Sequence, residues 1–394
     1  MRTRAAGTIF AASLAPARMD YEYIDTPEAL RQMAERLRSL PLLAADTEAA
    51  GYHRYFDRLS LVQLSSREEN FLVDPLALSR EELSPVAELL ADPEVETLFH
   101  DADFDLRILD RDLGAEVRGL WDTQIAAAFL GERSLGLGNV AGKYLGIHLP
   151  KEFQRADWAE RPLSEGMKQY ASTDTAHLPA LRDRLGADLE ARGRLAWAEE
   201  EFRRREGTRW SGDTDPAEAF LRVKGARDLS PRGLAILREV YAWREGVARE
   251  RDQATFRVLG NQSLIEIGLR PPRTEAALVA IGGVSPGMVQ RRGAEILGAV
   301  ERGEEVPDSE LPRFPTAKRW DRDPELDARV EALKLARNRR ADELELDPGF
   351  LVSRALLEEI GRQQPSTPEA LGEVPGVRRW QVEAVGDALL GTLR

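Results

Sequence analysis

The sequence predicts an α/β domain followed by two copies of a small all-α domain. Between residues 20 and 130, short strand-like runs alternate with segments of helical pattern. Beyond residue 217 the pattern is helical, and residues 261–300 align without gaps on residues 354–393. A chain of 394 residues is long enough for two or three domains.

The composition limits the classes of site that the chain can contain. There are no cysteines, which excludes disulfides, thiolate metal sites and a cysteine nucleophile, and fits a reducing cytoplasm. No apolar run is long enough to span a membrane, so we expect a cytoplasmic protein. The formal net charge of −13 argues against a uniformly basic nucleic-acid binder. It permits a local basic groove, and it fits a site that gathers carboxylates around cations.

The first residues form a segment of their own. Two arginines followed by small apolar residues loosely resemble a secretory signal, but a proline interrupts the weak apolar part. We expect residues 1–19 to be a disordered extension, or the result of a start codon placed too far upstream, with Met19 beginning the folded protein.

The strands of the α/β domain are expected to lie close together in the chain. Residues 42–49 have the composition of a buried strand, residues 58–66 alternate like a half-buried strand, and residues 70–75 form a third. Their short separation favours antiparallel pairing. A further strand is expected at 95–100. The remaining segments are predicted as helices, including 27–39, 79–92, 103–114 and a mostly buried helix at 120–131.

Proline-rich and polar segments divide the chain. The polar segment 206–216 marks the end of the first domain, which we place at 20–205. The helical copies are placed at 217–303 and 325–394, joined by a linker at 304–324 that contains four prolines. Apolar, proline and glycine positions are shared by the copies: Leu264 and Leu357, Ile267 and Ile360, Pro272 and Pro365, Leu278 and Leu371, Gly283 and Gly376, Gly293 and Gly386.

Acidic residues mark the candidate site. Asp46 and Glu48 are two apart on a strand, so their side chains project from one face. Two carboxylates that close are hard to keep ionised without a cation, and oxygen ligands suit Mg²⁺ or Mn²⁺. Asp105 begins a helix just after a strand. Tyr170 and Asp174 are four apart and share one helix face.

These three motifs, in this order, resemble those of the DEDD exonuclease superfamily. The tyrosine four residues before the last aspartate indicates its tyrosine branch, since Gln169 occupies the place of the histidine in the other branch. The segments 46–65, 121–131 and 151–175 are further similar to the ribonuclease D family, and the repeated unit resembles the HRDC domain. The resemblance covers about residues 20–394 and implies an RNase H-like fold, a mixed sheet flanked by helices, ahead of two HRDC-like domains.

The resemblance implies an activity and a cofactor. A metal-dependent 3′→5′ exoribonuclease would release 5′-monophosphates one at a time, with tRNA 3′ ends and small structured RNAs as substrates. Asp46, Glu48, Asp105 and Asp174 would bind two divalent ions, Mg²⁺ or Mn²⁺, about 4 Å apart. Tyr170, whose ordinary pKa near 10 makes it a poor base, would orient the attacking water. The expected partner is RNA with a free 3′ end, and the expected state is a monomer.

Substrate contacts are expected from four side chains near the acids: His53, Tyr55, Phe104 and Arg161. The residue after the D-x-E motif is Ala49, so packing against the terminal base is expected from Tyr52, His53 or Tyr55 instead. His53 is equally compatible with a surface role. A guanidinium suits phosphate, which favours substrate contact for Arg161, whereas Trp158 is expected to brace the catalytic helix. Asp122 is predicted to be a helix cap, and His100 to be structural.

Two alternatives remain open at this stage. A 3′→5′ DNA exonuclease of the same superfamily would keep the acids and differ in its tolerance of the 2′-hydroxyl. A non-catalytic nucleic-acid scaffold would keep the fold alone. The HRDC-like copies are expected either to bind RNA or only to pack against the exonuclease domain, and the arginines considered for phosphate contact are Arg291, Arg292, Arg337, Arg339 and Arg340.

Overall fold

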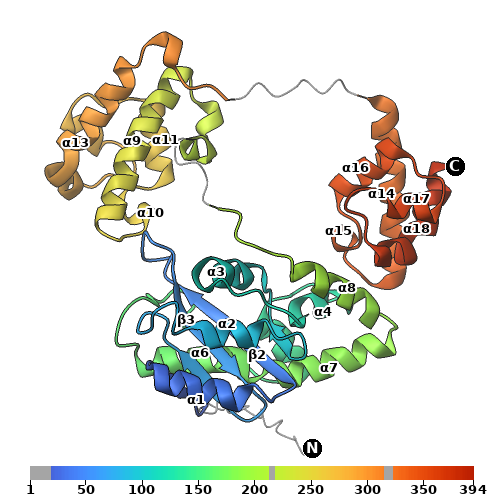
Figure 1. Ribbon diagram of the computed structural model, residues 1–394. Coiled ribbons are helices and arrows are strands. Elements are labelled where there is room, and N and C mark those ends of the chain that lie inside the picture. Colours follow the sequence, from blue (N-terminus) through green and yellow to red (C-terminus); the bar gives the residue numbers. More distant parts are fainter. Residues whose placement is uncertain (1–18, 213–217, 315–322) are drawn as a thin grey trace, which may run out of the picture.

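An α/β domain and two helical domains make up the structure (Figure 1). The computed structural model describes residues 19–212, 218–314 and 323–394. The expected disordered extension at 1–19 lies outside these residues, except for Met19. Among the described helices, none combines the length and the apolar character needed to cross a lipid bilayer.

The α/β domain is built on a mixed sheet with the strand order β1-β4-β3-β2-β5-β6 in the described residues. Its strands are β1 (Glu22–Ile24), β2 (Leu42–Ala49), β3 (Leu59–Ser65), β4 (Asn70–Val73), β5 (Glu96–Phe99) and β6 (Leu120–Asp122). Strands β2, β3 and β4 pair antiparallel, which confirms the prediction from their spacing. The pairs β1–β4, β2–β5 and β5–β6 are parallel, so both kinds of pairing meet in one sheet.

Helices cover both faces of this sheet. One face packs on α1 (Pro27–Leu37), α2 (Ser84–Leu90) and α3 (Asp103–Leu113). The other face carries α4 (Thr123–Phe129), α5 (Leu137–Leu145), α6 (Glu165–Ala176), α7 (Leu178–Ala191) and α8 (Leu195–Arg205). Along β2, Leu43 and Ala45 join the first core while Leu42 and Ala44 join the second, as strand alternation requires. Asp46 and Glu48 continue the second series, so they face the side of α6.

One predicted helix is partly wrong. Residues 120–131 were expected to form a single buried helix, but the segment begins as strand β6 and becomes helical only at Thr123. The three strand residues are fixed by parallel pairing with β5, in which Thr97 lies opposite Leu120. A pairing partner more than twenty residues away leaves no periodic trace in so short a segment. The short strand β1, held at the sheet edge by β4, was not predicted for the same reason.

The two helical domains repeat one arrangement. The first contains α9 (Pro231–Glu250), α10 (Thr255–Val258), α11 (Asn261–Leu269), α12 (Glu275–Val279) and α13 (Pro286–Glu305), preceded by the short turns η1 (Ala219–Arg222) and η2 (Ala226–Asp228) and followed by η3 (Asp308–Glu310). The second contains α14 (Pro324–Leu344), α15 (Pro348–Leu351), α16 (Arg354–Gln363), α17 (Pro368–Gly372) and α18 (Arg379–Leu393). Gly283 and Gly376, predicted to set equivalent turns, both have positive φ angles, 81° and 91°.

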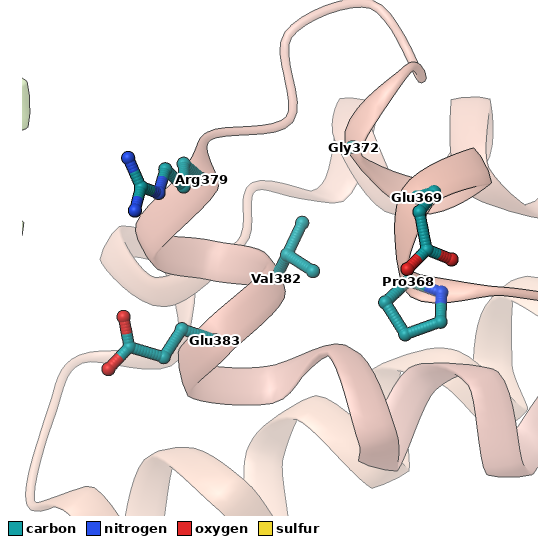
Figure 2. A pocket seen from close by; sticks show the side chains of 6 residues that line it. All are labelled: Pro368, Glu369, Gly372, Arg379, Val382 and Glu383. Atoms are coloured by element: carbon teal, nitrogen blue, oxygen red, sulfur yellow. The ribbon is translucent and has the colours of Figure 1, made fainter.

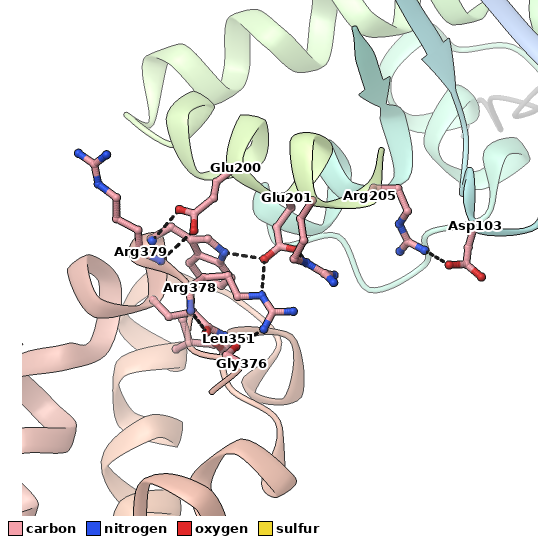
Figure 3. Close-up of polar contacts among 11 residues, drawn as sticks. Asp103, Glu200, Glu201, Arg205, Leu351, Gly376, Arg378 and Arg379 are labelled. Carbon is pink, nitrogen blue, oxygen red and sulfur yellow. Dashed lines mark hydrogen bonds and ion pairs between the residues drawn. The ribbon is translucent and has the colours of Figure 1, made fainter. Parts of the chain in front are cut away.

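Each helical domain contacts the α/β domain at a different place (Figure 1). In the first, the Ala254 amide near α10 donates to the carbonyl oxygen of His53 at 2.9 Å, and Asp252 accepts from the Phe56 amide. In the second, α18 meets α8, where Glu201 accepts from the indole of Trp380 at 2.8 Å and from Arg378 at 3.1 Å (Figure 3).

One cavity lies in the second helical domain, between α17 and α18 (Figure 2). It has a volume of about 540 Å³ and is lined by Pro368, Glu369, Gly372, Arg379, Val382 and Glu383. None of the acids predicted to bind metal borders it.

Candidate active site

Strand β2 presents the first two acids. Asp46 and Glu48 are half-buried on the face that α6 covers. The pairing register with β3 shifts between Glu48 and Ala49, which marks a β-bulge directly after the second acid. Bulges re-aim side chains and are frequent beside active sites. Here the bulge ends the regular part of β2 where the chain leaves the site.

Helix α6 brings the last motif onto the same face. Its first turn is capped by Ser164, whose hydroxyl accepts from the Met167 amide, and the helix packs on β2, β3 and β4. One carboxylate oxygen from each of Asp46, Glu48 and Asp174 lies within 4.8 Å of the others. Tyr170 lies one turn before Asp174, as predicted, and a hydrogen bond joins the two side chains.

Asp105 reaches the site from the start of α3. Its carboxylate is buried and accepts a hydrogen bond of 2.5 Å from the Thr47 hydroxyl, the residue between the two strand acids. It stands beside the group of three acids whose oxygens lie within 4.8 Å, without belonging to it. The structure therefore gathers all four predicted acids, with three in mutual contact range and one held by β2.

Asp122 fixes the start of α3. Its carboxylate caps α4 by accepting from the amides of Gln124 and Ile125, which confirms the predicted helix cap. The same carboxylate accepts from the amides of Asp101 and Ala102, at 3.1 and 2.9 Å. One buried aspartate thus ties the beginnings of two helices together and sets where Asp105 enters the site.

Burial raises the pKa values of all four acids, and repulsion between neighbouring carboxylates adds to the effect for Asp46 and Glu48. Burial raises the pKa of Asp174 to about 7, although a hydrogen bond with Tyr170 acts the other way. Burial likewise raises the pKa of Asp105 to about 7 against the effect of Thr47. The pKa values of Asp46 and Glu48 are raised well above their usual range, first by burial and then by the neighbouring carboxylates. Burial also raises the pKa of Tyr170, together with the nearby carboxylates of Asp174, Glu48 and Asp46.

The donor set fits divalent cations. The four side chains offer oxygen atoms alone, which hard ions such as Mg²⁺ and Mn²⁺ prefer. Within the described ranges, no lysine, arginine or histidine forms an ion pair with any of the four. Their negative charge is therefore uncompensated by the protein itself, which is the condition under which a carboxylate cluster binds a cation.

Arg161 has no free donor for a phosphate. Its guanidinium donates two hydrogen bonds of 2.7 Å to the carboxylate of Asp74 and one of 2.6 Å to the Ser60 carbonyl oxygen. The remaining N–H groups donate to the carbonyl oxygens of Trp158 and Glu160. All five donors of the group are used. The geometry is that of a brace between β3, β4 and the segment before α6, and not of a phosphate contact.

The other predicted substrate residues lie apart from one another. His53 and Tyr55 are half-buried where the loop after β2 meets the first helical domain, with Arg257 donating to His53 and Arg249 lying over the Tyr55 ring. Phe104 is exposed on the first turn of α3, next to Asp105. The structure thus places Phe104 beside an acid and the other two at a domain interface.

Bracing residues behave largely as predicted. Trp158 is buried against Tyr170, with ring centroids 6.1 Å apart. Both nitrogens of His100 are engaged, one with the Thr123 hydroxyl and one with the Leu135 carbonyl oxygen, which agrees with a structural role. Arg337, considered for phosphate contact, is buried and donates to the carbonyl oxygen of Val352.

Two residues of the site were not predicted. Thr47 escaped notice because its partner, Asp105, is remote in sequence. Gln63 lies opposite Asp46 in the β2–β3 ladder, is fully buried, and has no hydrogen-bond partner for either amide atom among the described residues. A glutamine in the otherwise apolar centre of "LSLVQLS" was the available signal.

A cavity opens beside the catalytic face of α6. It has a volume of about 110 Å³, and its lining includes Tyr170, Asp174, Lys151 and Gln154. The cavity connects Asp174, a predicted metal ligand, and Tyr170, the predicted water-orienting residue, with polar and basic side chains of the segment before α6. Space, acids and hydrogen-bond donors therefore coincide at one place in the α/β domain.

Comparison with known proteins agrees with this fold. Residues 21–190 match the family model described as 3′-5′ exonuclease, and residues 233–300 and 327–393 each match the HRDC domain. The chain is 32% identical to ribonuclease D of Pseudomonas paraeruginosa over 95% of its length and 98% of the relative. It is also 32% identical to ribonuclease D of Escherichia coli over 75% of its length and 78% of the relative.

Two solved structures share the whole arrangement. A crystal structure of a protein from Bifidobacterium adolescentis superposes with a TM-score of 0.79 at 27% identity, covering 94% of this chain and 96% of that one. The crystal structure of Escherichia coli RNase D superposes with a TM-score of 0.68 at 29% identity, covering 95% and 99%. With the four acids, the tyrosine and both HRDC domains in place, the chain belongs to the ribonuclease D family.

Proposed function

We propose that this protein is a metal-dependent 3′→5′ exoribonuclease that releases 5′-monophosphates. The observation that carries the proposal is the group of Asp46, Glu48 and Asp174, whose oxygens lie within 4.8 Å of one another beside Tyr170. Such a cluster destabilises the metal-free fold, because like charges repel in a partly buried site. A reaction that depends on bound cations explains why the protein keeps this destabilising cluster.

The acids and Tyr170 have separate tasks. Asp46, Glu48, Asp105 and Asp174 would bind two divalent ions, which when bound supply an activated water and stabilise charge on the phosphoryl group. Thr47 keeps Asp105 in place through its hydrogen bond. Because the pKa of Tyr170 is raised, its hydroxyl remains protonated at neutral pH and orients the attacking water by hydrogen bonding.

The proposed substrates are precursor tRNA and other small structured RNAs with a free 3′ end, processed by a cytoplasmic monomer. Support comes from the relative in Escherichia coli, whose structure is described as that of an exoribonuclease involved in structured RNA processing. Acids without basic partners can bind the metal ions that a 3′-terminal phosphodiester needs for hydrolysis. Two HRDC domains also accompany the exonuclease domain, as they do in this family.

A matched pair of oligonucleotides tests the activity. With Mn²⁺, a 5′-labelled single-stranded RNA should shorten one nucleotide at a time from its 3′ end, and faster than DNA of the same sequence. Asp174→Asn should reduce the rate by at least about 100-fold, because the cation is misplaced, while RNA binding is kept. Asp183→Asn, which alters an acid on α7 that pairs with Arg67, is the matched control and should leave the rate unchanged.

Other outcomes would reject the proposal. Faster digestion of DNA than of RNA would identify a DNA exonuclease. RNA binding without digestion of any 3′-ended substrate would identify a scaffold. Near-normal turnover by Asp174→Asn would show that the metal assignment is wrong.

A further inference from the structure

Two exposed aromatic side chains meet across the contact between the α/β domain and the first HRDC domain. Tyr52 lies in the loop after β2, four residues beyond Glu48, and Phe256 lies on α10. Their ring centroids are 5.7 Å apart. Tyr52 is 46% exposed and Phe256 is 53% exposed. The two rings pack together and yet each leaves aromatic surface accessible to the solvent.

Positive charge surrounds this pair. The guanidinium of Arg155 lies over the Tyr52 ring, 5.8 Å from its centroid, and Arg257 donates to the ring of His53. Arg249 lies over the neighbouring Tyr55. In the described part of the chain these arginines contact aromatic and histidine side chains and form no ion pair with a carboxylate. In a chain with a net charge of −13, this is a local surface suited to an anion.

The second HRDC domain provides an internal comparison. Its short helix α15 occupies the place of α10 and also contacts the α/β domain through an aromatic residue, Phe350. Phe350 packs into a cluster with Phe129 and Trp380, at 4.8 and 5.9 Å between centroids. Arg378 of the same domain pairs with Glu201 (Figure 3). An aromatic side chain used only for docking is therefore covered in this fold, whereas Phe256 is not.

A short chain segment links the exposed pair with the cavity beside α6. Gln154 lines the cavity together with Tyr170 and Asp174, and its chain neighbour Arg155 covers Tyr52. The ring of His53 donates from Nε2 to the Arg155 carbonyl oxygen at 2.7 Å, since Nδ1 accepts from Arg257. A strand of nucleic acid running from the cavity along this segment would meet Arg155 and then the two rings.

We propose that Tyr52 and Phe256 form a two-domain stacking platform for the single-stranded RNA that leads to the 3′ end, and that Arg155, Arg249 and Arg257 bind its phosphates. The inference rests on the proposed function, because it names how the substrate of that site is captured. Aromatic faces bind bases of any sequence, and arginines beside them neutralise the backbone, so the platform holds RNA without selecting its sequence. The first HRDC domain thereby becomes part of the substrate site.

Conservative substitutions separate stacking from simple packing. Binding is measured with the full chain in EDTA, using fluorescence anisotropy of a 5′-fluorescein-labelled 12-nucleotide oligoadenylate. Phe256→Leu, which keeps an apolar side chain but removes the π face, should raise the Kd about tenfold. Phe256→Trp should bind within about twofold of the wild type. Tyr52→Leu should match Phe256→Leu, and with Mn²⁺ both leucine variants should raise KM with kcat unchanged.

Phe350→Leu is the matched control, since it makes the same change at the equivalent helix of the second copy, and it should leave RNA binding unaltered. Wild-type affinity in both Phe256→Leu and Tyr52→Leu would overturn the platform, as would a Phe256→Trp variant as weak as Phe256→Leu. These results are independent of cleavage. If the wild-type chain does not shorten RNA with Mn²⁺ but binding still depends on the two rings, the proposed function fails and the platform stands.

Discussion

At the scale of single residues, the main feature is the gathering of four acids at one site. Asp46, Glu48 and Asp174 lie within contact range of one another, and Asp105 is close enough to raise the pKa of Asp46. Each acid is buried to a degree that ordinary carboxylates avoid without a partner. Thr47 and Tyr170 donate hydrogen bonds that partly offset this cost. The site is thus unfavourable by itself, and the proposed cations would offset this cost.

A pH dependence of stability follows from these acids. A carboxyl group whose pKa rises from 3.8 to about 7 on folding, as for Asp174, stays protonated in the folded state while the unfolded state ionises. Metal-free protein should therefore lose stability as the pH rises from about 4 to about 7. Mn²⁺ should raise the melting temperature more at pH 8 than at pH 5, because metal binding needs ionised carboxylates.

Calorimetry of chelator-treated protein measures this effect. Asp46→Asn is the comparison variant, since it removes one of the repelling acids, and its melting temperature should fall less steeply with pH. A wild-type melting temperature that rises between pH 5 and pH 8 without metal would contradict the assignment.

At the scale of elements, the site depends on where strands and helices end. The bulge after Glu48 ends β2 at the site, and Asp122 joins the starts of α3 and α4 so that Asp105 meets Thr47. Ser164 caps α6 and places Tyr170 and Asp174 over the sheet. None of these devices carries out chemistry. They hold carboxylates from three elements in one place, where a small displacement has a large effect on rate.

Close helix packing gives a testable prediction at the scale of elements. In the first HRDC domain α9 and α13 approach so closely that a Cβ atom on Gly303 would lie 2.4 Å from the Cα atom of Ile236. Gly303→Ala should therefore destabilise this domain by about 1–3 kcal/mol through overpacking. On the same helix, a Cβ atom on Gly298 would meet only the end of the Arg302 side chain, at 3.7 Å. Gly298→Ala should stabilise by up to about 1 kcal/mol, as alanine favours helices.

Urea unfolding of the two variants beside the wild type decides the matter. If Gly303→Ala gains as much stability as Gly298→Ala, the helices can separate without cost and the packing described is wrong.

For the whole molecule, the two HRDC domains join the exonuclease domain by different chemistry. The second is anchored by an aromatic cluster of Phe129, Trp197 and Trp380 and by acids of α8. The first is joined through a polar loop beside the two exposed rings. The two expected roles of the copies, RNA binding and packing alone, therefore fall to different domains. The second copy packs against the exonuclease domain, and the proposed platform assigns RNA contact to the first.

The anchor of the second domain is testable at Glu201. This buried carboxylate accepts from the Trp380 indole, Arg378 and Arg204, and its pKa is lowered by those partners despite burial. Glu201→Ala should cost about 3 kcal/mol, because it leaves buried donors without a partner. Glu199→Ala removes an exposed glutamate whose ion pair with Arg203 is 3.8 Å long, and should change stability by less than about 0.5 kcal/mol.

Guanidinium chloride unfolding followed by tryptophan fluorescence, to which Trp380 and Trp197 contribute, measures the stability of each variant. Equal stability of the two alanine variants would mean that Glu201 does not hold the domains together.

The sequence by itself determined the faces on which the acids lie, the internal repeat and the family. Asp46 and Glu48 share a face because strands alternate, and Tyr170 and Asp174 share one because helices repeat; both follow from local geometry. The repeat between residues 261–300 and 354–393 was visible because apolar anchors and glycines recur at fixed intervals. The family and the four candidate ligands were therefore within reach of the sequence alone.

Only the tertiary structure showed which groups remote in sequence contact each other. Arg161 looked like a phosphate ligand, yet Asp74 and three carbonyl oxygens take all its donors. Residues 120–122 became a strand only because β5 lies beside them, and Phe256 meets Tyr52 only because two domains dock. Local spacing fixes which face of an element a side chain occupies, whereas the group that it meets there depends on contacts between segments that only the folded chain brings together.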